Sequence, residues 1–528
     1  MTIHTEQELL ALCLALIGRQ DGLSAAERKL AKTVRIPASR HPEMEAIRLA
    51  ISDGNDPLGD IFTSIRTAAE RRSAGAIYTP APIVHSMMAW LAGQGTPARI
   101  VDPGAGSGRF ILAAGATFPD VPLVAVEQDP LAALMLRANL SARGWADRTT
   151  VLVKDYREVK LPRCAGMTAF VGNPPYVRHH DITEDWKAWY ASTFARFGIK
   201  ASALAGLHLH FFLQTRLLAK TGDVGAFVTS AEWMDVNYGS ALRRLLLDEL
   251  GGIALHVLEP TAAAFPGTAT TAAITCFRVG ETAEPVRVRA VDELQCLNGL
   301  SRGIDIPRKQ LHAAPRWSIV VRPSGPASAG DIELGELFRV HRGQVTGAND
   351  IWIAGEHAQD LPDRVKLPAV TKARDLIRAG AHLHSAEVLR RVIDLPAELD
   401  DFSKEERRRI SAFLSWAKLN GADQGYVAQH RKAWWSVGLK APAPILCTYM
   451  ARRPPQFTLN ACAARHINIA HGLYPRQPLT DEAMGRLVMW LNRNIDTGSG
   501  RTYAGGLTKF EPKEVERLRI PGLETLLA

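Results

Sequence analysis

The segment Asn173-Pro174-Pro175-Tyr176, at the end of the apolar run TAFVG, is the part of this sequence that most directly suggests chemistry. Two consecutive prolines fix the backbone and remove two N–H donors, which leaves carbonyl and side-chain oxygens as acceptors. The Asn173 side-chain oxygen and the Pro174 carbonyl could accept both protons of a planar amino group and so direct its nitrogen lone pair at an electrophile. Tyr176 adds a stacking face for a ring. Taken alone, these residues could also form a rigid turn with a half-buried tyrosine.

Upstream, VDPGAGSGRF predicts a strand that ends at Val101, a glycine-containing turn and then a helix. Asp102 starts the turn, and Gly104, Gly106 and Gly108 follow it. Glycines let the backbone pass close to a ligand and turn sharply into a helix. A plain strand–helix turn has the same glycines, so this loop is weak evidence for a nucleotide-like ligand by itself.

Two further predicted strands also end in acidic residues, as the first strand does at Asp102. LVAVEQD ends in Glu127, which could accept hydrogen bonds from ribose hydroxyls, and TVLVKDY ends in Asp155 and Tyr156. Asp155 could accept from an adenine amino group while Tyr156 packs on the ring. With Asp102, three successive strands thus end in an acidic residue at the carboxyl edge of the predicted sheet, where open α/β sheets bind ligands. No GxxxxGK[ST] phosphate loop occurs, which disfavours ATP.

The pattern of apolar residues predicts three parts. Helical spacing dominates residues 1–72, whereas short apolar runs alternate with helical patterns in residues 73–321. Such alternation is typical of an α/β domain with a parallel sheet and helices on both faces. Glycines and prolines accumulate at 322–331, and residues 322–528 combine strand-like pieces with a basic helix, which indicates a mixed α+β domain.

Composition narrows the function classes. The 528 residues carry a net charge of +9, which is compatible with a polyanionic partner and equally with a merely basic surface. The six cysteines form no CxxC pair and the histidines show no HExxH spacing, so we expect no metal site. No apolar run is long enough to span a bilayer and the N-terminus lacks signal-peptide features, so we expect a cytoplasmic protein with no membrane partner.

The order of these motifs resembles the gamma-class adenine-N6 DNA methyltransferases, the TaqI-like group, over about residues 73–290. In that family a G-x-x-x-TP segment closes over the methionine end of S-adenosylmethionine, and GAIYTP matches it with Thr79 and Pro80. The glycine loop, Glu127, Asp155 and NPPY follow in the family order. Helix alignment matches Phe211 to a family aromatic that lines the cofactor pocket, although His208 or His210 could take that place.

The resemblance implies a Rossmann-like class I methyltransferase sheet and S-adenosylmethionine as cofactor. It implies methyl transfer to the N6 amino group of adenine in double-stranded DNA after the base has been flipped out of the duplex. In FPGTATTAAITCF, Phe265 matches the family phenylalanine that stacks on the flipped base opposite Tyr176. The expected setting is bacterial restriction–modification, with a monomer acting on DNA at the nucleoid, and a separate restriction endonuclease is compatible with it.

Residues 322–528 would then form the target-recognition domain. Arg465, His466 and Asn460 lie in a basic, aromatic-containing stretch that could read bases, but a solvated basic face explains the same residues. The run KEERRR at 404–409 favours an exposed helix face.

Three other functions stay open at this point. NPPY chemistry also serves cytosine N4, and it serves glutamine amides in proteins, although enzymes of the latter kind are shorter and lack a large basic C-terminal domain. A DNA-binding module with a degenerate methyltransferase fold is the third, but the intact glycine loop and NPPY disfavour it. The 72 N-terminal residues show no nuclease motif and are few for a nuclease domain.

Overall fold

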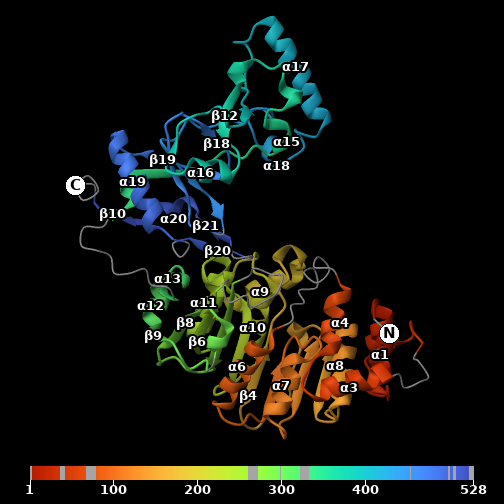
Figure 1. The fold of residues 1–528 in the computed structure, drawn as a ribbon. Helices are drawn as coiled ribbons and strands as arrows, with labels where there is room; N and C mark the ends of the chain where they lie inside the picture. The colour runs from red at the N-terminus through yellow and green to blue at the C-terminus, as the bar shows by residue number, and fades with distance from the viewer. Residues whose placement is uncertain are drawn as a thin grey trace. The chain divides into compact units, whose positions relative to one another are not determined.

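The computed structural model describes residues 3–35, 42–66, 79–259, 271–297, 299–321, 332–451, 453–496, 500–503 and 507–522. Its contacts divide the chain into two compact units (Figure 1). Unit 1 comprises Met1–Pro323, and unit 2 comprises Ser324–Tyr503 with Leu507–Ala528.

Unit 1 is built on a nine-stranded sheet with the order β3-β2-β1-β4-β5-β7-β6-β8-β9. Strands β1 to β5 run parallel to their neighbours in the order β3-β2-β1-β4-β5, and β7 lies antiparallel between β5 and β6. The strands are β1 (Arg99–Asp102), β2 (Leu123–Glu127), β3 (Thr149–Val153), β4 (Thr168–Gly172), β5 (Val224–Ser230), β6 (Gly252–Leu258), β7 (Ala272–Arg278), β8 (Val286–Val291) and β9 (Ile304–Ile306). Because β1 pairs with both β2 and β4, the loops that follow these three strands share one edge of the sheet.

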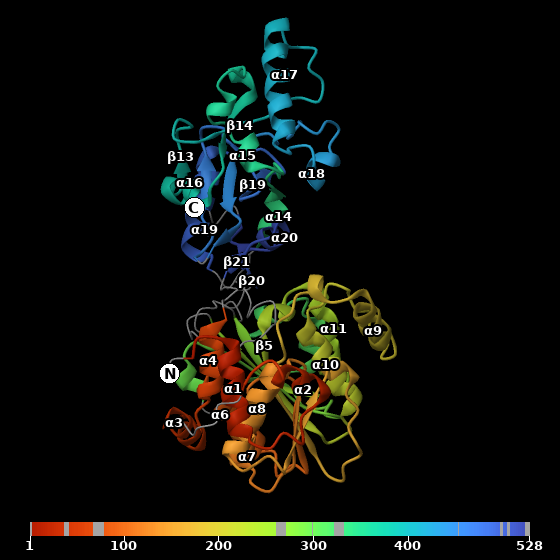
Figure 2. The same ribbon diagram turned by 90° about the vertical axis from the view of Figure 1, so that its right-hand side faces the viewer.

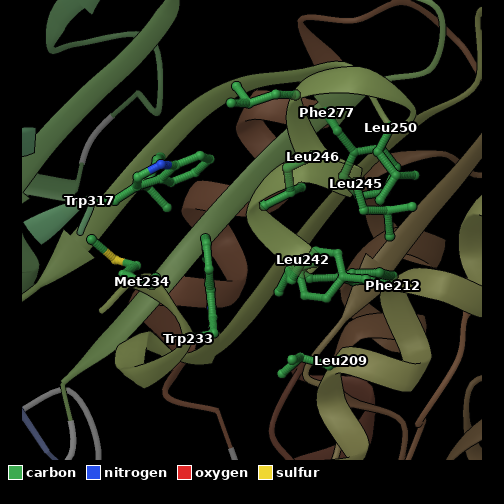
Figure 3. Close-up of a cluster of buried hydrophobic side chains, with 14 of the residues drawn as sticks. Leu209, Phe212, Trp233, Met234, Leu242, Leu245, Leu246, Leu250, Phe277 and Trp317 are labelled. Atoms are coloured by element: carbon green, nitrogen blue, oxygen red, sulfur yellow. The ribbon is translucent and has the colours of Figure 1, made fainter. Parts of the chain in front are cut away.

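Helices cover both faces of this sheet, because successive strand residues point to opposite sides. Ile100 packs with α6 (Ala81–Ala92) and α7 (Arg109–Thr117), whereas Val101 packs with α9 (Glu184–Ala195), α10 (Leu207–Leu218) and α11 (Ser240–Asp248). Figure 3 shows the second cluster, in which Phe212, Leu242 and Trp233 meet beside the sheet. Helices α12 (Arg308–Ala313) and α13 (Ser318–Val321) complete unit 1. The α/β fold with a Rossmann-like class I methyltransferase sheet is thus confirmed.

The N-terminal helices pack on the outer side of α8 (Pro130–Ala142), as Figures 1 and 2 show. They are α1 (Glu6–Ile17), α2 (Ala25–Ala31), α3 (Pro42–Ser52) and α4 (Pro57–Ile65). Helix α8 is buried on two sides: Leu136 and Leu140 face the sheet, while Leu134 and Met135 face the N-terminal helices. The residues before Arg66 therefore share a hydrophobic core with the helix that follows β2.

Unit 2 is a mixed α+β structure, as predicted. Its largest sheet has the order β11-β19-β15-β17-β13, with β11 (Phe338–Arg342), β19 (Ala470–Pro475), β15 (Ile445–Thr448), β17 (Phe457–Asn460) and β13 (His382–Leu383). Smaller sheets are formed by β14 (Arg391–Ile393), β12 (Lys366–Val370) and β18 (Arg465–His466), by β16 (Met450–Ala451), β21 (Leu507–Lys509) and β20 (Arg501–Tyr503), and by β10 (Ile332–Glu333) with β22 (Arg519–Ile520). The helices include α16 (Ala373–Ala379), α17 (Lys404–Leu419), α19 (Asp481–Asn494) and α20 (Pro512–Glu516).

Each unit has its own hydrophobic core. In unit 2, Phe338, Phe457 and Leu487 belong to one buried cluster, and Trp352 and Ile410 belong to another. Within the described ranges, no helix is both long enough and apolar enough to cross a membrane.

Gly108 is a position where the fold requires glycine. It lies at the N-terminus of α7 with a φ of 102°, and a Cβ there would clash with Leu136 Cδ1 of α8. We expect Gly108→Ala to lower the free energy of unfolding by about 2–5 kcal/mol, from a strained left-handed backbone and an overpacked contact together. Chemical denaturation measures this change.

Gly144→Ala is the matched control. Gly144 also has a positive φ, 66°, but a Cβ there meets nothing within 4 Å. This variant should lose only about 1–2 kcal/mol from backbone strain. Equal losses in both variants would contradict the contact with Leu136.

Candidate functional site

The glycine loop between β1 and α7 lies directly against the Asn173-Pro174-Pro175 segment. A Cβ on Gly104 would lie 3.6 Å from Pro175 Cδ, 3.6 Å from Phe211 Cε1 and 3.8 Å from the Asn173 carbonyl oxygen. Gly106, with a φ of 55°, turns the backbone in the same loop. A side chain at Gly104 would fill the space between the loop, α10 and the segment after β4, so glycine keeps this space open.

One cavity of unit 1 gathers residues from several of the predicted motifs. Its predicted members are Thr79, Gly104, Gly106, Glu127, Asn173, Pro175 and Phe211. The other lining residues are Phe62, Pro103, Ala105, Ser107, Arg109, Phe110, Val126, Gln128, Asp129 and Ala132. The cavity therefore joins the carboxyl ends of β1, β2 and β4 to a helix of the N-terminal segment.

The Asn173 carboxamide is held by a residue from the opposite wall. Its Nδ2 donates to Thr79 Oγ1 at 3.0 Å. The Thr79 hydroxyl accepts this hydrogen bond, which holds the Asn173 carboxamide at the cavity. Pro174 is buried and Pro175 lines the cavity, so two prolines fix the backbone directly after Asn173.

Tyr176 is half-buried beside His208, whose ring it meets edge-on with 6.0 Å between the centroids. Burial raises the pKa of the Tyr176 hydroxyl well above its usual range. The ring is not among the groups that line the cavity. Phe265, its predicted stacking partner, lies outside the described residues.

Asp102 lies beneath the glycine loop and is fully buried. Its Oδ1 accepts from the Gly104 N–H at 3.2 Å, while its Oδ2 has no hydrogen-bond partner among the described residues. Burial, opposed by the Gly104 hydrogen bond and aided by the charge of Glu127, raises the pKa of the Asp102 carboxyl to about 8.

Glu127, at the end of β2, is held by two backbone donors. The Gly106 N–H donates to Oε2 and the Asp129 N–H donates to Oε1, each at 2.8 Å. Burial raises the pKa of this carboxyl above its ordinary value in spite of these donors. Each oxygen keeps a second lone pair, so the side chain can still accept from a ligand hydroxyl in the cavity.

Asp155 and Tyr156 do not line the cavity. The Asp155 carboxylate is paired with Arg157, whose Nη2 lies 2.6 Å from Oδ2 and whose backbone N–H donates to Oδ1 at 2.9 Å. Tyr156 is buried, shares a hydrogen bond of 3.0 Å with Thr215, and packs on Phe211 with 5.0 Å between ring centroids. Tyr156 therefore supports an aromatic ring of the cavity wall from behind.

The structure separates the three candidates on α10. Phe211 lines the cavity, whereas His208 and His210 are buried away from it. Burial lowers the pKa of each imidazole to about 3, and the charge of Arg157 contributes at His210. Both histidines are therefore neutral at physiological pH.

The remaining residues predicted to bind the cofactor, Pro80 and Gly108, lie outside the cavity lining. Pro80 precedes α6 and Gly108 precedes α7, and neither lines the cavity. No cluster of three or more potential ligands for a metal ion occurs within the part of the chain that the structure describes.

Several cavity residues could not be singled out from the sequence. Phe62, Arg109 and Asp129 lack a motif of their own, and the sequence around Phe62, DPLGDIF, carries only the signals of a helix start. Proline at the first position after an acidic cap is such a signal, and it gives no information about a distant loop.

In unit 2, the suggested base-reading residues Asn460 and His466 are buried. The Asn460 Nδ2 donates to the carbonyl oxygens of Ala443 and Ala464 at 2.9 Å each, and its oxygen accepts from the Ala464 N–H at 3.0 Å. Asn460 thus stabilises a loop of unit 2 and is not available for a base edge. The basic run at the start of α17 is exposed, as its pattern indicated.

Comparison with known proteins agrees with this fold and shows the family of the chain. Residues 159–252 match the Eco57I restriction-modification methylase family, and residues 327–527 match the C-terminal domain of the type II methyltransferase M.Eco57I. The type II methyltransferase M.XamI of Xanthomonas campestris pv. amaranthicola is 79% identical over 529 residues, which covers 100% of both chains. The chain belongs to the type II DNA methyltransferases of restriction–modification systems.

Two more distant relatives are also similar to this chain, one in sequence over a short stretch and one in fold. A tRNA1(Val) (adenine(37)-N6)-methyltransferase of Shewanella amazonensis is 35% identical over 96 residues, which cover 18% of this chain and 40% of that protein. The solved structure of the type IIL restriction-modification enzyme MmeI in complex with DNA has a TM-score of 0.54 at 14% identity, and it covers 97% of this chain and 78% of that chain. The latter likeness shows the fold alone.

Asp102 should make stability depend on pH. Because its folded-state pKa is raised to about 8 from an ordinary 3.8, the folded protein holds a proton that the unfolded chain loses as pH rises between these values. Stability from this group is present below pH 3.8 and is lost by about 1.4 kcal/mol per pH unit as pH rises toward 8. Asp102→Asn should remove this slope, so denaturation from pH 5 to 8 should show the variant gaining stability relative to wild type. A constant difference between the two across this range would contradict the raised pKa.

Proposed function

We propose that this methyltransferase transfers a methyl group from S-adenosylmethionine to the N6 amino group of adenine in double-stranded DNA, as the gamma-class enzymes do. One observation carries the proposal: the glycine loop, Thr79 and Phe211 line the same cavity as Asn173 and Pro175. A cofactor site and an amino-group site that share a wall permit a direct transfer between two bound molecules.

The residues around the cavity fit S-adenosylmethionine. When bound, this cofactor supplies an electrophilic methyl group on a positively charged sulfur. Glu127 and Asp129 at the cavity favour a cationic ligand over an anionic one. Thr79, Gly104, Gly106, Glu127 and Phe211 would hold the cofactor. Asp155 would contribute only through lone pairs that its pairing with Arg157 leaves unused.

The segment after β4 suits the substrate amine. The Asn173 side-chain oxygen and the Pro174 carbonyl would accept the two amino protons, which increases the electron density on the nitrogen. Tyr176 would stack on the extrahelical base, with Phe265 as the second aromatic. Each such stack is worth about 1–3 kcal/mol, which offsets part of the cost of removing the base from the duplex.

Adenine is the base that the combined observations favour. The motif order from Thr79 to Tyr176 is that of the adenine-N6 group, and the local tRNA relative is named for the N6 position of an adenine. The size of unit 2 favours a nucleic acid over a protein substrate, because a glutamine amide would not need a second cored domain.

Unit 2 is proposed to recognise the target sequence. Lys404, Arg407 and Arg408 at the start of α17 are exposed and can neutralise phosphates, which position a duplex without reading its sequence. A separate restriction endonuclease acting on the same sequence is the proposed functional partner, because the family works in restriction–modification.

Asn173→Ala should lower the single-turnover rate of methyl transfer by about 10²–10³, because an acceptor aimed at the reacting amine is lost. Asn173→Ser, which keeps a hydroxyl acceptor, should be less impaired. The dissociation constant for S-adenosylmethionine, measured by calorimetry, should change little in either variant. Wild-type turnover in Asn173→Ala would refute the assignment of the segment.

Base-modification sequencing of DNA from cells that express the chain tests the whole proposal. We expect N6-methyladenine in one short sequence context and none in cells that carry Asn173→Ala. N4-methylcytosine in that context would replace the base assignment, and unmodified DNA would contradict the proposed substrate.

A further inference from the structure

Asp56 connects the N-terminal helices to the glycine loop. It caps the N-terminus of α4, where its Oδ1 accepts from the Gly59 N–H at 3.0 Å, and only 9% of its surface is exposed. Its Oδ2 accepts from Ser107 Oγ at 2.5 Å and from Arg109 Nε at 2.9 Å. Both donors belong to the loop and first helical turn after β1, about 50 residues further along the chain.

A hydrogen-bonded chain continues from Asp56 to the proposed catalytic amide. Arg109 Nη1 donates to the Thr79 carbonyl oxygen at 3.2 Å, and Asn173 Nδ2 donates to the Thr79 hydroxyl at 3.0 Å. Thr79 is therefore held at its backbone by Arg109 and holds Asn173 with its side chain. Four residues from four separate segments form one connected network.

Gly59 and Asn139 lie beside Asp56 and permit or reinforce its contact with Ser107. A Cβ on Gly59 would clash with Asp56 Oδ2 and lie 2.8 Å from Ser107 Oγ, so glycine permits the close approach. Asn139 of α8, fully buried, donates from Nδ2 to the Ser107 carbonyl oxygen at 2.8 Å and to Asp56 Oδ1 at 3.2 Å. These contacts bind the N-terminal segment, the glycine loop and α8 at one point.

The next turns of α4 reach the cavity itself. Phe62 lines the cavity, and the Arg66 guanidinium lies 4.2 Å from the centroid of its ring. Arg66 also pairs with Asp129, another cavity residue, at 3.5 Å. Displacing α4 would therefore disturb the cavity wall as well as the network.

We propose that Asp56 is a positioning residue for methyl transfer: through Arg109 and Thr79 it sets the orientation of the Asn173 carboxamide. This inference rests on the proposed function of Asn173. A buried carboxylate that balances a guanidinium keeps Arg109 in place, and an amide turned away from its substrate loses its effect on the reaction. Helix α4, which Asp56 caps, is then connected to the Asn173 carboxamide.

Asp56→Asn tests the proposal in the full chain. The amide keeps the shape of the carboxylate but removes its charge and places an N–H beside the donors Ser107 and Arg109. We expect the single-turnover rate at saturating cofactor and DNA to fall about ten- to a hundredfold, since misplacement of a reacting group by 1 Å can cost about 10²-fold. Cofactor affinity should fall less than the rate.

Glu27→Gln is the matched control. Glu27 is fully buried, caps α2 and pairs with Arg137 of α8 at 2.6 Å, so it also ties the N-terminal segment to α8 without contacting the glycine loop. This variant should lose thermal stability and keep the rate. An equal loss of rate in both variants, or a wild-type rate in Asp56→Asn, would overturn the proposal.

A second pair of variants decides the matter if Asp56→Asn does not fold. Thr79→Val removes the hydroxyl that accepts from Asn173 at nearly constant volume, whereas Thr79→Ser keeps it. The network predicts a rate at least tenfold lower for the valine variant than for the serine variant, and equal rates would overturn it. These rates count methyl groups transferred to DNA, whichever base receives them. If the wild-type enzyme methylates cytosine, that result refutes the assignment of adenine and leaves the test of the network unaffected.

Discussion

The pairing of β1 with β4 is the constraint on which the site depends. Parallel neighbours end at the same edge of a sheet, so the glycine loop after β1 and the Asn173 segment after β4 must emerge side by side. The space between them is narrow, because a Cβ on Gly104 would already be in van der Waals contact with Pro175 and Phe211. Strand order brings the two motifs together, and a missing side chain leaves room for a ligand between them.

Three carboxyl groups lie near this edge of the sheet, and each is stabilised in a different way. Glu127 accepts from two backbone N–H groups, and Asp56 is balanced by Arg109. Asp102 has a single donor and a raised pKa, so it keeps its proton near neutral pH. The least compensated carboxyl thus lies directly beneath the loop that we propose holds a cationic cofactor.

The sequence predicted the α/β fold of unit 1 well because the signals for it are local. Alternating apolar runs identify the strands of unit 1, and the glycine loop and NPPY each lie within ten residues. Asp56 and Phe62 could not be found in this way, since their partners are distant in sequence and a helix-cap pattern looks the same wherever the helix packs. Asp155 and Asn460 show a second limit of prediction from sequence. Their residue types suggested side-chain oxygens that could accept from a ligand, but these oxygens already accept from Arg157 and from the Ala464 N–H.

The separate cores of the two units have a consequence for how such an enzyme can diversify. Among the residues that the structure describes, each of these buried clusters lies within one unit, and substitutions without shared partners have nearly additive effects on stability. On the proposed division of labour, a lineage can therefore accumulate changes in unit 2 that alter the DNA sequence it reads while the reaction chemistry persists unchanged. New specificities then arise by drift in one unit, without rebuilding a catalyst.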